Sequence, residues 1–327
     1  NFDAVKENAR KAWNKELGKI VVEGDSEKDK TLFYSALYRT MMMPRNRTND
    51  IEGWPENTPL WDDYYTGWDT WRTLFPLMTL INPQVVSDNI NSVIARFRKN
   101  RIVKDAFIAG QDVYNEQGGN DVDNIIADAF VKNIDGVNWQ EAYELLKFNA
   151  DSQRLGKQIS YHPAKLDAIM SGYKKRGWMP AGKMSCSVSL EYSYNDFCIA
   201  EGASGLGKNL DYQKYYTRSQ KWTNLWNPEM ESYGFKGFIC PKSPDNTWVE
   251  IDPCYRWFSW DDYFYEGSSW TYSYFVPHDF PKLIDLCGGK KTFAERLEYG
   301  LAHGLIDYSN EPAFLSIQSF HHAGRPD

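Results

Sequence analysis

The fold class is decided first by residues 82–97, which read NPQVVSDNINSVIARF. Their apolar side chains return at the spacing of one helical face, and they are Val86, Ile90, Val93, Ile94 and Phe97. Asn82-Pro83 is typical of a helix start, because the first turn of a helix tolerates proline. The stretch therefore predicts a helix with one buried face.

The same spacing recurs along the whole chain. It predicts further helices over residues 32–41 (after the helix start Asp25-Ser26), 125–130, 139–146, 188–206, 270–276, 281–286, 292–301 and 312–320. Strand signals are sparse, and the clearest short runs lie at residues 19–22 and 248–251. We therefore expect a mainly α-helical chain.

Long polar, aromatic and glycine-rich stretches separate these helices. They cover residues 44–68, 104–120, 151–187 and 227–267. Loops of this length are rarely structureless in a compact domain unless they build a site. Helices alternating with such loops indicate a barrel of helical hairpins whose loops surround one end. The sequence contains no repeat clear enough to give the number of hairpins.

Composition excludes several classes of protein. The 327 residues fit one large domain or two smaller ones, and no stretch approaches the roughly 18 apolar residues that span a bilayer. A net charge of -7 argues against a nucleic-acid partner, which requires clustered basic residues. The five cysteines form no C-x-x-C pair and have no histidine at zinc spacing.

Aromatic residues are unusually frequent, at 16% of the chain with 13 Trp and 21 Tyr. Large rings can fill the gaps between helices, or they can form platforms for the apolar faces of sugars. Both interpretations remain open for any single ring.

One nucleotide-binding motif is only apparent. Residues 202–208 match a phosphate-binding loop up to Lys208, but Asn209 stands where Ser or Thr should hold magnesium. These glycines follow a predicted helix rather than a strand, so we interpret them as its end at Gly207. The zinc-protease and serine-hydrolase motifs are absent from the sequence.

A carboxylate among aromatic residues is the first catalytic candidate. Glu266 follows Phe264-Tyr265 and precedes Gly267-Ser268-Ser269-Trp270 at a predicted helix start. An apolar setting keeps a carboxyl protonated near neutral pH, as a general acid requires. The alternative is a capping carboxylate, whose charged form the helix dipole favours.

Three other motifs are candidates for binding. Trp68-Asp69 could pair a stacking ring with an acceptor for sugar hydroxyls, or Asp69 could cap a helix with Arg72 as an ordinary ion-pair partner. Acidic, oxygen-rich turns occur at residues 118–123 and 309–312. Such turns suit a hard cation such as calcium.

In their order along the chain, these motifs resemble those of the family 92 glycoside hydrolases, the calcium-dependent exo-α-mannosidases. The matching stretches are residues 33–38, 68–74, 107–110, 118–121, 126–132, 189–192, 266–270, 276–279, 310–312 and 323–326. They include the motifs E-G-x-x-W at Glu266 and N-E-P at Asn310. They span nearly the whole chain.

The resemblance implies a β-sandwich joined to an (α/α)6 barrel. Residues 1–24 would be a linker and first helix leading from a β-sandwich absent here, and residues 25–327 would form a barrel that lacks its C-terminal part. The implied activity is the inverting release of terminal mannose from glycans by a secreted, periplasmic or cell-surface enzyme.

The resemblance also assigns roles to residues. Glu266 would be the general acid, and Asn310 and Glu311 would lie at a Ca2+ site. Trp68, Asp69, Gly118, Gly119, Asn120 and Glu311 would bind the sugar. An inverting pair of carboxyl groups stands about 6.5 to 9.5 Å apart, which leaves room for a water.

Two departures from the family pattern leave alternatives open. The G-x-x-D-x-G-x-M-S-A-W motif that supplies the aspartate base is absent, so we expect the base on a separate C-terminal fragment or other sequence. Ala313-Phe314-Leu315 replaces the Ser-His-His that often follows N-E-P, which puts the linkage in doubt. A noncatalytic sugar-binding remnant and another (α/α)6 carbohydrate enzyme, such as a glucosidase or lyase, are the alternative functions.

Overall fold

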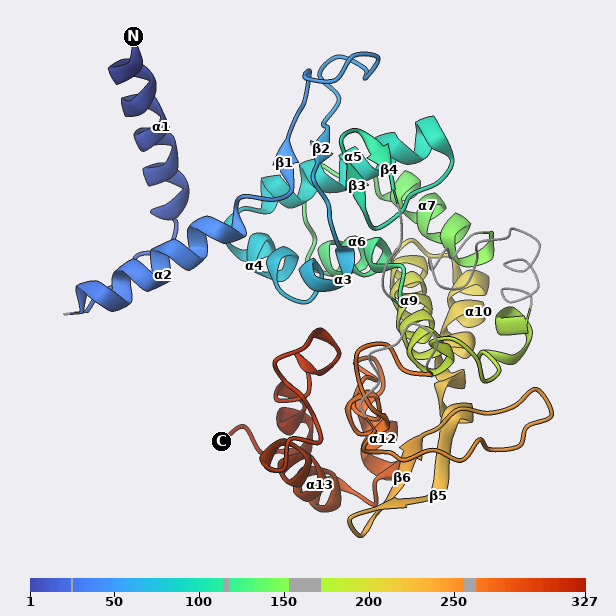
Figure 1. Ribbon diagram of the computed structural model, residues 1–327. Coiled ribbons are helices and arrows are strands. Elements are labelled where there is room, and N and C mark those ends of the chain that lie inside the picture. Colours follow the sequence, from blue (N-terminus) through green and yellow to red (C-terminus); the bar gives the residue numbers. More distant parts are fainter. Residues whose placement is uncertain (25, 114–117, 153–171, 256–262) are drawn as a thin grey trace.

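The computed structural model describes residues 1–24, 26–113, 118–152, 172–255 and 263–327, and it is mainly helical, as the sequence predicts (Figure 1). Asp25 and parts of the predicted loops 104–120, 151–187 and 227–267 lie outside the described residues. The α-helices are α1 (Phe2–Leu17), α2 (Glu27–Thr40), α3 (Gly67–Thr70), α4 (Leu74–Ile81), α5 (Pro83–Asn100), α6 (Asp121–Val131), α7 (Trp139–Asp151), α9 (Ser185–Gly205), α10 (Asn209–Ser219), α11 (Ser269–Tyr272), α12 (Phe280–Leu286) and α13 (Lys290–Ala302).

Short 3-10 helices and strand pairs complete the described part. The 3-10 helices are η1 (Gln220–Leu225), η2 (Glu311–Ala313) and η3 (Gln318–Ala323). Three antiparallel pairs join β1 (Arg45–Asn46) to β2 (Trp61–Asp62), β3 (Phe107–Ile108) to β4 (Gln111–Asp112), and β5 (Trp226–Ser232) to β6 (Phe235–Ile239).

Helix α5 confirms the stretch that decided the fold class. Pro83 occupies its first turn, and the predicted apolar face from Val86 to Phe97 is buried. The helix ends at Arg101, which adopts the left-handed conformation with φ 52°. That ending is typical of helix C-termini.

Helix α9 is the central element of the fold. It packs against α6, α7 and α10, and Figure 1 shows it between the helices of the first half and the β5–β6 segment. Its buried residues surround the helix and include Glu191 and Asp196. A helix buried on all sides brings its charged side chains into the protein interior.

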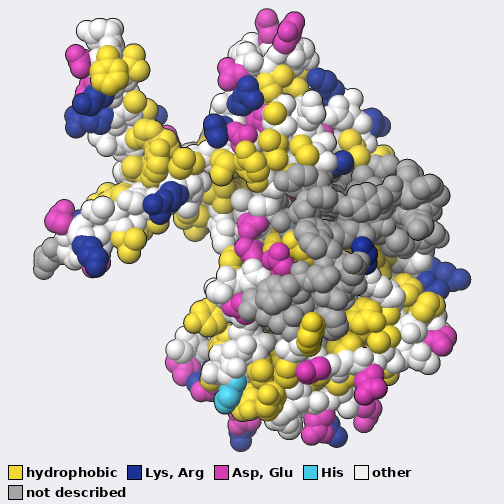
Figure 2. Space-filling model, viewed as in Figure 1, with side chains coloured by type: hydrophobic (Ala, Val, Ile, Leu, Met, Phe, Trp, Pro, Cys, Tyr) yellow, Lys and Arg dark blue, Asp and Glu magenta, His cyan; other side chains and the backbone are white. Residues whose placement is uncertain are grey.

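The first two helices are much less buried. Helix α1 has no buried residue, and α2 buries only Leu37. Figures 1 and 2 show this hairpin extending from the rest of the chain with apolar side chains on its surface, among them Phe2 and Leu32.

The predicted strand at residues 19–22 is wrong. Residues 21–22 have no regular secondary structure, and a side chain from α2 bonds the backbone of this segment instead. The Tyr34 hydroxyl donates to the Ile20 carbonyl at 3.0 Å and accepts from the Val22 amide at 3.2 Å. A side chain thus satisfies the backbone groups that a neighbouring strand would otherwise pair.

The strand prediction at residues 248–251 also fails, and a real hairpin was missed. Only Trp248 forms a bridge, to Lys242. Strands β5 and β6 are joined by Tyr233-Gly234, both with positive φ. A two-residue turn of this kind matches the twist of a hairpin, so Tyr233-Gly234 was the available signal.

The C-terminal helix predictions are partly wrong. Helices α12 and α13 confirm two of them, but α11 is only four residues long. Residues 312–320 form 3-10 turns rather than an α-helix, with the Phe314 amide bonded to the Glu311 carbonyl and the Ser319 amide to the Ser316 carbonyl. Glu311 therefore begins a 3-10 helix directly after Asn310 and does not lie on the face of an α-helix.

The sequence predicted neither a phosphate-binding loop at residues 202–208 nor a membrane-spanning helix. Residues 202–205 lie at the end of α9, and Gly207 follows with φ 69°, so these glycines end a helix as expected. Among the described residues, no helix is both long enough and apolar enough to cross a bilayer.

Candidate active site

Glu266 lies in a strained backbone position just before α11. Its φ is 46°, in the left-handed region that few residues other than glycine adopt. The cap of α11 is Ser268, whose Oγ accepts a hydrogen bond from the Thr271 amide at 3.2 Å. Glu266 is therefore not the capping residue, which removes the structural alternative for this carboxylate.

Neighbouring groups hold this backbone from both sides. The Tyr272 hydroxyl donates to the Tyr265 carbonyl at 2.6 Å, and the Tyr265 amide donates to Ser187 Oγ at 2.7 Å. Asn310 Nδ2 donates to the Glu266 carbonyl at 3.0 Å. Strain that is held in this way is typical of functional sites.

Asp69 and Glu311 form a second part of the site. Thr66 caps α3, so Asp69 lies in its first turn and is not the cap. Glu311 donates a hydrogen bond to Asp69, and burial, this bond and the nearby charges of Asp69 and Glu266 raise the pKa of Glu311 to about 7. Three carboxyl groups from distant parts of the sequence therefore lie close together.

Trp68 is buried beneath this cluster, with 2% of its surface exposed. Its Nε1 donates to Glu191 Oε1 at 2.8 Å, and Arg72 Nη2 donates to the same oxygen at 2.9 Å. The Trp68 ring contacts the Tyr265 ring, with centroids 5.3 Å apart. Trp68 thus supports the site from inside, and a sugar contact through its ring stays a prediction.

Gly118 and Gly119 lie against the same glutamate, and Asn120 follows them. A Cβ atom on Gly118 would stand 3.2 Å from Glu191 Cγ, and one on Gly119 would stand 3.1 Å from Glu191 Oε2. The Asn120 amide donates to Asn195 Oδ1 at 3.0 Å. A side chain at Gly118 or Gly119 would therefore crowd Glu191 where this loop passes α9.

Two further buried carboxylates adjoin this loop. Asp105 accepts hydrogen bonds from the Asp121 and Val122 amides, both at 3.1 Å, at the start of α6. Burial raises the pKa of Asp105 to about 6 and raises the pKa of Asp121, which the charges of Glu191 and Asp105 raise further. This part of the interior is strongly acidic.

The structure brings some of the predicted residues together directly. Glu266, Asn310, Glu311 and Asp69 share contacts, whereas Gly118 and Gly119 reach the cluster only through Glu191 and Trp68, and Asn120 contacts Asn195. The sequence assigned no role to Glu191, although residues 189–192 match the family pattern, and Tyr265 entered only as part of the apolar setting of Glu266. The available signal for Glu191 was a carboxylate within a long run of small and apolar residues at 185–203.

The side chains fit part of a calcium shell. Asn310 and Glu311 offer amide and carboxylate oxygens, which calcium accepts, and a cation would offset the crowding that raises the pKa of Glu311. No group of three or more His, Cys, Asp or Glu side chains within the described ranges is arranged to hold a metal ion. Backbone, water and sugar oxygens would have to supply the remaining ligands.

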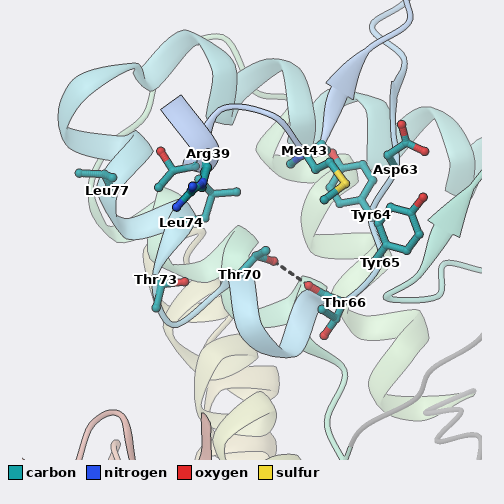
Figure 3. Close-up of a pocket in the computed structure, with 12 residues that line it drawn as sticks. Arg39, Met43, Asp63, Tyr64, Tyr65, Thr66, Thr70, Thr73, Leu74 and Leu77 are labelled. Carbon is teal, nitrogen blue, oxygen red and sulfur yellow. Dashed lines mark hydrogen bonds between the residues drawn. The ribbon is translucent and has the colours of Figure 1, made fainter. Parts of the chain in front are cut away.

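A cavity of about 430 Å³ lies beside α3 (Figure 3). Its lining includes Arg39 from α2, Thr70 from α3 and Leu74 from α4. Thr70 Oγ1 donates to the Thr66 carbonyl at 2.9 Å within this lining. The cavity borders the residue after Asp69 but does not include Glu266 or Glu311, so it is distinct from the carboxylate cluster.

Comparisons with known proteins find similar glycosidases. An uncharacterized secreted glycosidase from the fungus Arthroderma benhamiae is 31% identical over the whole of this chain, which covers 41% of that protein. A family 92 inverting mannosidase from Bacteroides thetaiotaomicron aligns with 97% of this chain at 26% identity and a TM-score of 0.81, over 46% of its own length.

A second solved structure is a family 92 α-mannosidase from the same bacterium in complex with mannoimidazole. It aligns with all of this chain at 25% identity and a TM-score of 0.82, over 44% of its own length. The chain therefore spans less than half the length of each of these proteins. The glycosyl hydrolase family 92 catalytic domain matches residues 1–327, and this chain belongs to that family.

Proposed function

We propose that this chain is part of a calcium-dependent exo-α-mannosidase that inverts configuration and uses Glu266 as its general acid. The observation that carries the proposal is the contact of Asn310 and Glu311 with Glu266, and of Glu311 with Asp69. Residues from α3, the α11 start and η2 thus meet around a single acidic cluster. Such a cluster suits glycoside hydrolysis, which needs paired carboxyl groups around the scissile bond.

The reaction would proceed in one displacement. Glu266 donates its proton to the leaving oxygen as the glycosidic bond breaks, and a water attacks the opposite face of the anomeric carbon. The water loses its proton to a base, for which we assign no residue of this chain. The products are mannose of inverted configuration and the shortened glycan.

The binding residues divide into two groups. Asp69 and Glu311 would accept hydrogen bonds from the hydroxyls of a terminal mannose, while Gly118, Gly119 and Asn120 would present backbone atoms. Asn310 and Glu311 would hold Ca2+, which when bound supplies positive charge to sugar hydroxyls and favours distortion of the ring. Asn310 also orients Glu266 through its amide nitrogen.

The wider assignments are part of the same proposal. Residues 25–327 would belong to an (α/α)6 barrel, and residues 1–24 would be the linker and first helix. The exposed surface of α1, which has no buried residue, supports a connecting role for residues 1–24. A location outside the cytoplasm is supported by the fungal relative, which is described as secreted.

Leaving-group dependence tests the acid. With the full-length polypeptide, Glu266→Gln should lower kcat on an alkyl mannoside by about 10²-fold or more, because the leaving oxygen then receives no proton. A dinitrophenyl mannoside, whose leaving group needs no proton, should lose far less. Glu311→Gln serves as the matched control. If the loss of kcat on the alkyl mannoside, relative to the dinitrophenyl mannoside, is larger in Glu311→Gln than in Glu266→Gln, then Glu311 is the general acid.

The anomer formed first tests the reaction class. Proton NMR should show β-mannose as the initial product from an α-mannoside. Initial α-mannose would indicate a retaining enzyme, and an unsaturated product would indicate a lyase. Mannose binding without release of product would favour a noncatalytic sugar-binding protein.

A further inference from the structure

A buried ion pair lies directly behind the proposed active site. Arg72 Nη2 stands 2.9 Å from Glu191 Oε1, and the two side chains are 0% and 1% exposed. Removing both charges from water costs about as much as their attraction returns. Relative to an apolar pair of similar volume, the ion pair therefore adds little stability, and its effect on geometry becomes the more informative property.

The pair fixes Trp68 from two directions. Glu191 Oε1 accepts a hydrogen bond from the indole Nε1 at 2.8 Å, which holds the edge of the ring. The Arg72 guanidinium lies 4.9 Å from the ring centroid and also donates to the Trp68 carbonyl. Both the ring and the backbone of Trp68 are thus tied to the ion pair.

Trp68 connects the two halves of the proposed site. It precedes Asp69, which accepts a hydrogen bond from Glu311. Its ring packs edge-on against Tyr265, which precedes Glu266. A shift of the indole would therefore change the distance between Asp69 and Glu266.

We infer that Glu191 and Arg72 are positioning residues which, through Trp68, set the placement of Asp69 relative to the acid Glu266. The inference rests on the proposed function, because its consequence is for proton donation by Glu266. Neither residue touches the sugar in this scheme. In this scheme they act on the cluster through Trp68, and Glu191 also packs against Gly118 and Gly119.

Close packing leaves the carboxylate little room to move. A Cβ on Gly119 would stand 3.1 Å from Glu191 Oε2, and a Cβ on Gly67 would stand 3.1 Å from the Asp121 side chain. The backbone at Gly67, before Trp68, and at Gly119, beside Glu191, is thus close to buried acidic side chains. Closely packed interiors transmit small displacements to their neighbours.

The test is Glu191→Gln in the full-length polypeptide, which conserves volume but removes the charge. We expect kcat on an alkyl mannoside to fall about tenfold to a hundredfold, because a small misplacement of a catalytic group has an effect of this size. The fall on a dinitrophenyl mannoside should be several times smaller. The indole N–H resonance of Trp68, assigned from the Trp68→Phe spectrum, should shift.

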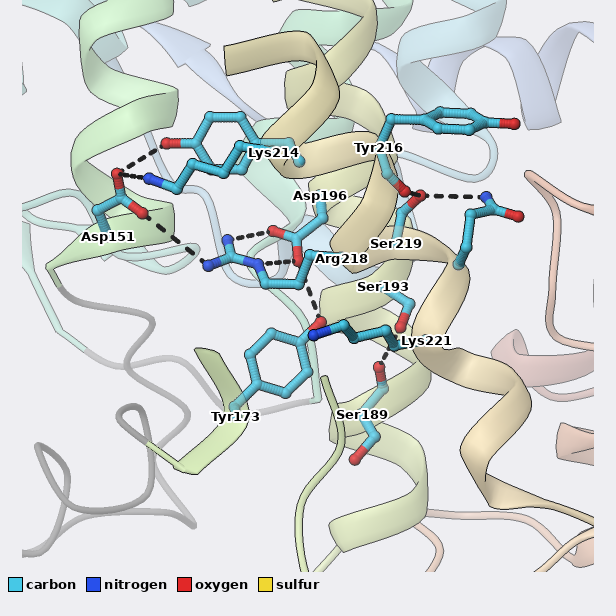
Figure 4. A network of polar contacts seen from close by, with 12 residues as sticks. Asp151, Tyr173, Ser189, Ser193, Asp196, Lys214, Tyr216, Arg218, Ser219 and Lys221 are labelled. Atoms are coloured by element: carbon cyan, nitrogen blue, oxygen red, sulfur yellow. Dashed lines mark hydrogen bonds and ion pairs between the residues drawn. The ribbon is translucent and has the colours of Figure 1, made fainter. Parts of the chain in front are cut away.

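A matched control comes from the same helix. Asp196 lies five residues after Glu191 on α9 and forms its own buried pair with Arg218 (Figure 4). Asp196→Asn should lower stability but leave the ratio of the two kcat values and the Trp68 resonance unchanged. If it alters the ratio as Glu191→Gln does, the positioning role is overturned.

A second variant covers the case in which Glu191→Gln fails to fold. Trp68→Phe keeps a ring against Tyr265 but cannot donate to Glu191, and it should show the same selective loss on the alkyl mannoside. An active wild type whose variants lose equally on both substrates would overturn the inference alone. A wild type that cleaves neither mannoside would overturn the proposed function instead.

Discussion

Asn310 Nδ2 lies 3.0 Å from the backbone carbonyl of Glu266 and 3.4 Å from its Oε2. One amide therefore contacts both the strained backbone and the carboxylate of the proposed acid. Its other atom, Oδ1, remains available as an oxygen ligand. Asn310 can in this way orient the acid and contribute to a cation site with opposite ends of one side chain.

The two ends of Asn310 can be separated by substitution. Asn310→Asp keeps an oxygen but loses the donor, so it should retain calcium binding while kcat on an alkyl mannoside falls at least about tenfold. Asn310→Ala should lose both properties. Calcium titration by calorimetry and kcat measurement provide the two readouts. Equal calcium affinity in wild type and Asn310→Ala would contradict the ligand assignment.

Residues 82–97 and 188–206 made the helical class predictable, because a helix that buries one face or all faces leaves a clear apolar pattern. The hairpin of β5 and β6 was missed, since its strands mix charged and aromatic residues. The extended residues 21–22 were misjudged because a single hydroxyl from Tyr34 replaced a partner strand.

The carboxylates of the site could be predicted from the sequence, but the buried contacts that hold them in place could not. Asp69, Glu266 and Glu311 belong to motifs with implied roles, whereas Glu191 lies in the matching stretch 189–192, to which no role was assigned. Its side chain contacts Trp68 and Arg72, which lie 123 and 119 positions away from it in the sequence. Periodicity reports which face is buried but carries no information on such long-range pairs.

Calcium affinity should depend on pH through Glu311. Its pKa in the folded protein is raised to about 7, so a proton occupies the carboxyl group at lower pH and competes with the cation. The apparent association constant should fall by up to about tenfold per pH unit as pH drops below 7. Calorimetric titrations between pH 5 and 8 measure this. Glu311→Gln should bind weakly and without that dependence.

The pair of Arg218 and Asp196 should be important for stability. Arg218 Nε and Nη2 donate to Asp196 at 2.5 and 2.6 Å, and Arg218 also faces Asp151 on α7 (Figure 4). Arg218→Met leaves Asp196 buried without its cation, which should lower the free energy of unfolding by about 3–5 kcal/mol. Urea unfolding measures the change.

Lys214 provides the control for this pair. It bonds Asp151 Oδ2 at 2.7 Å, but its side chain is 47% exposed. Lys214→Met should therefore change the free energy of unfolding by no more than about 1 kcal/mol, since water screens exposed pairs. Similar losses in the two variants would show that burial does not decide the importance of the Arg218 pair.

His278 should make stability fall on acidification. Burial lowers its pKa from 6.5 to about 4, against smaller opposing effects from the Ser219 carbonyl and Asp196. The ring lies near Tyr194 and Phe197, and its Nδ1 has no hydrogen-bond partner. The folded state therefore favours the neutral ring, whereas the unfolded chain binds a proton near pH 6.5.

The sign follows from this difference in proton binding. Between about pH 6.5 and 4 the unfolded state holds a proton that the folded state lacks, so the free energy of unfolding decreases as pH falls through this window, by on the order of 1–3 kcal/mol. Above about pH 6.5 the ring is neutral in both states, so His278 then has no pH-dependent effect on the free energy of unfolding. His278→Phe retains a ring between Tyr194 and Phe197 but cannot titrate, so the difference in stability between wild type and variant isolates this contribution from all other groups. Urea unfolding at pH 7.5, 6, 5 and 4.5 should show wild type losing stability relative to His278→Phe at each step below 6.5. A constant difference across the series would mean that the imidazole accepts its proton in the folded protein as readily as in the unfolded chain.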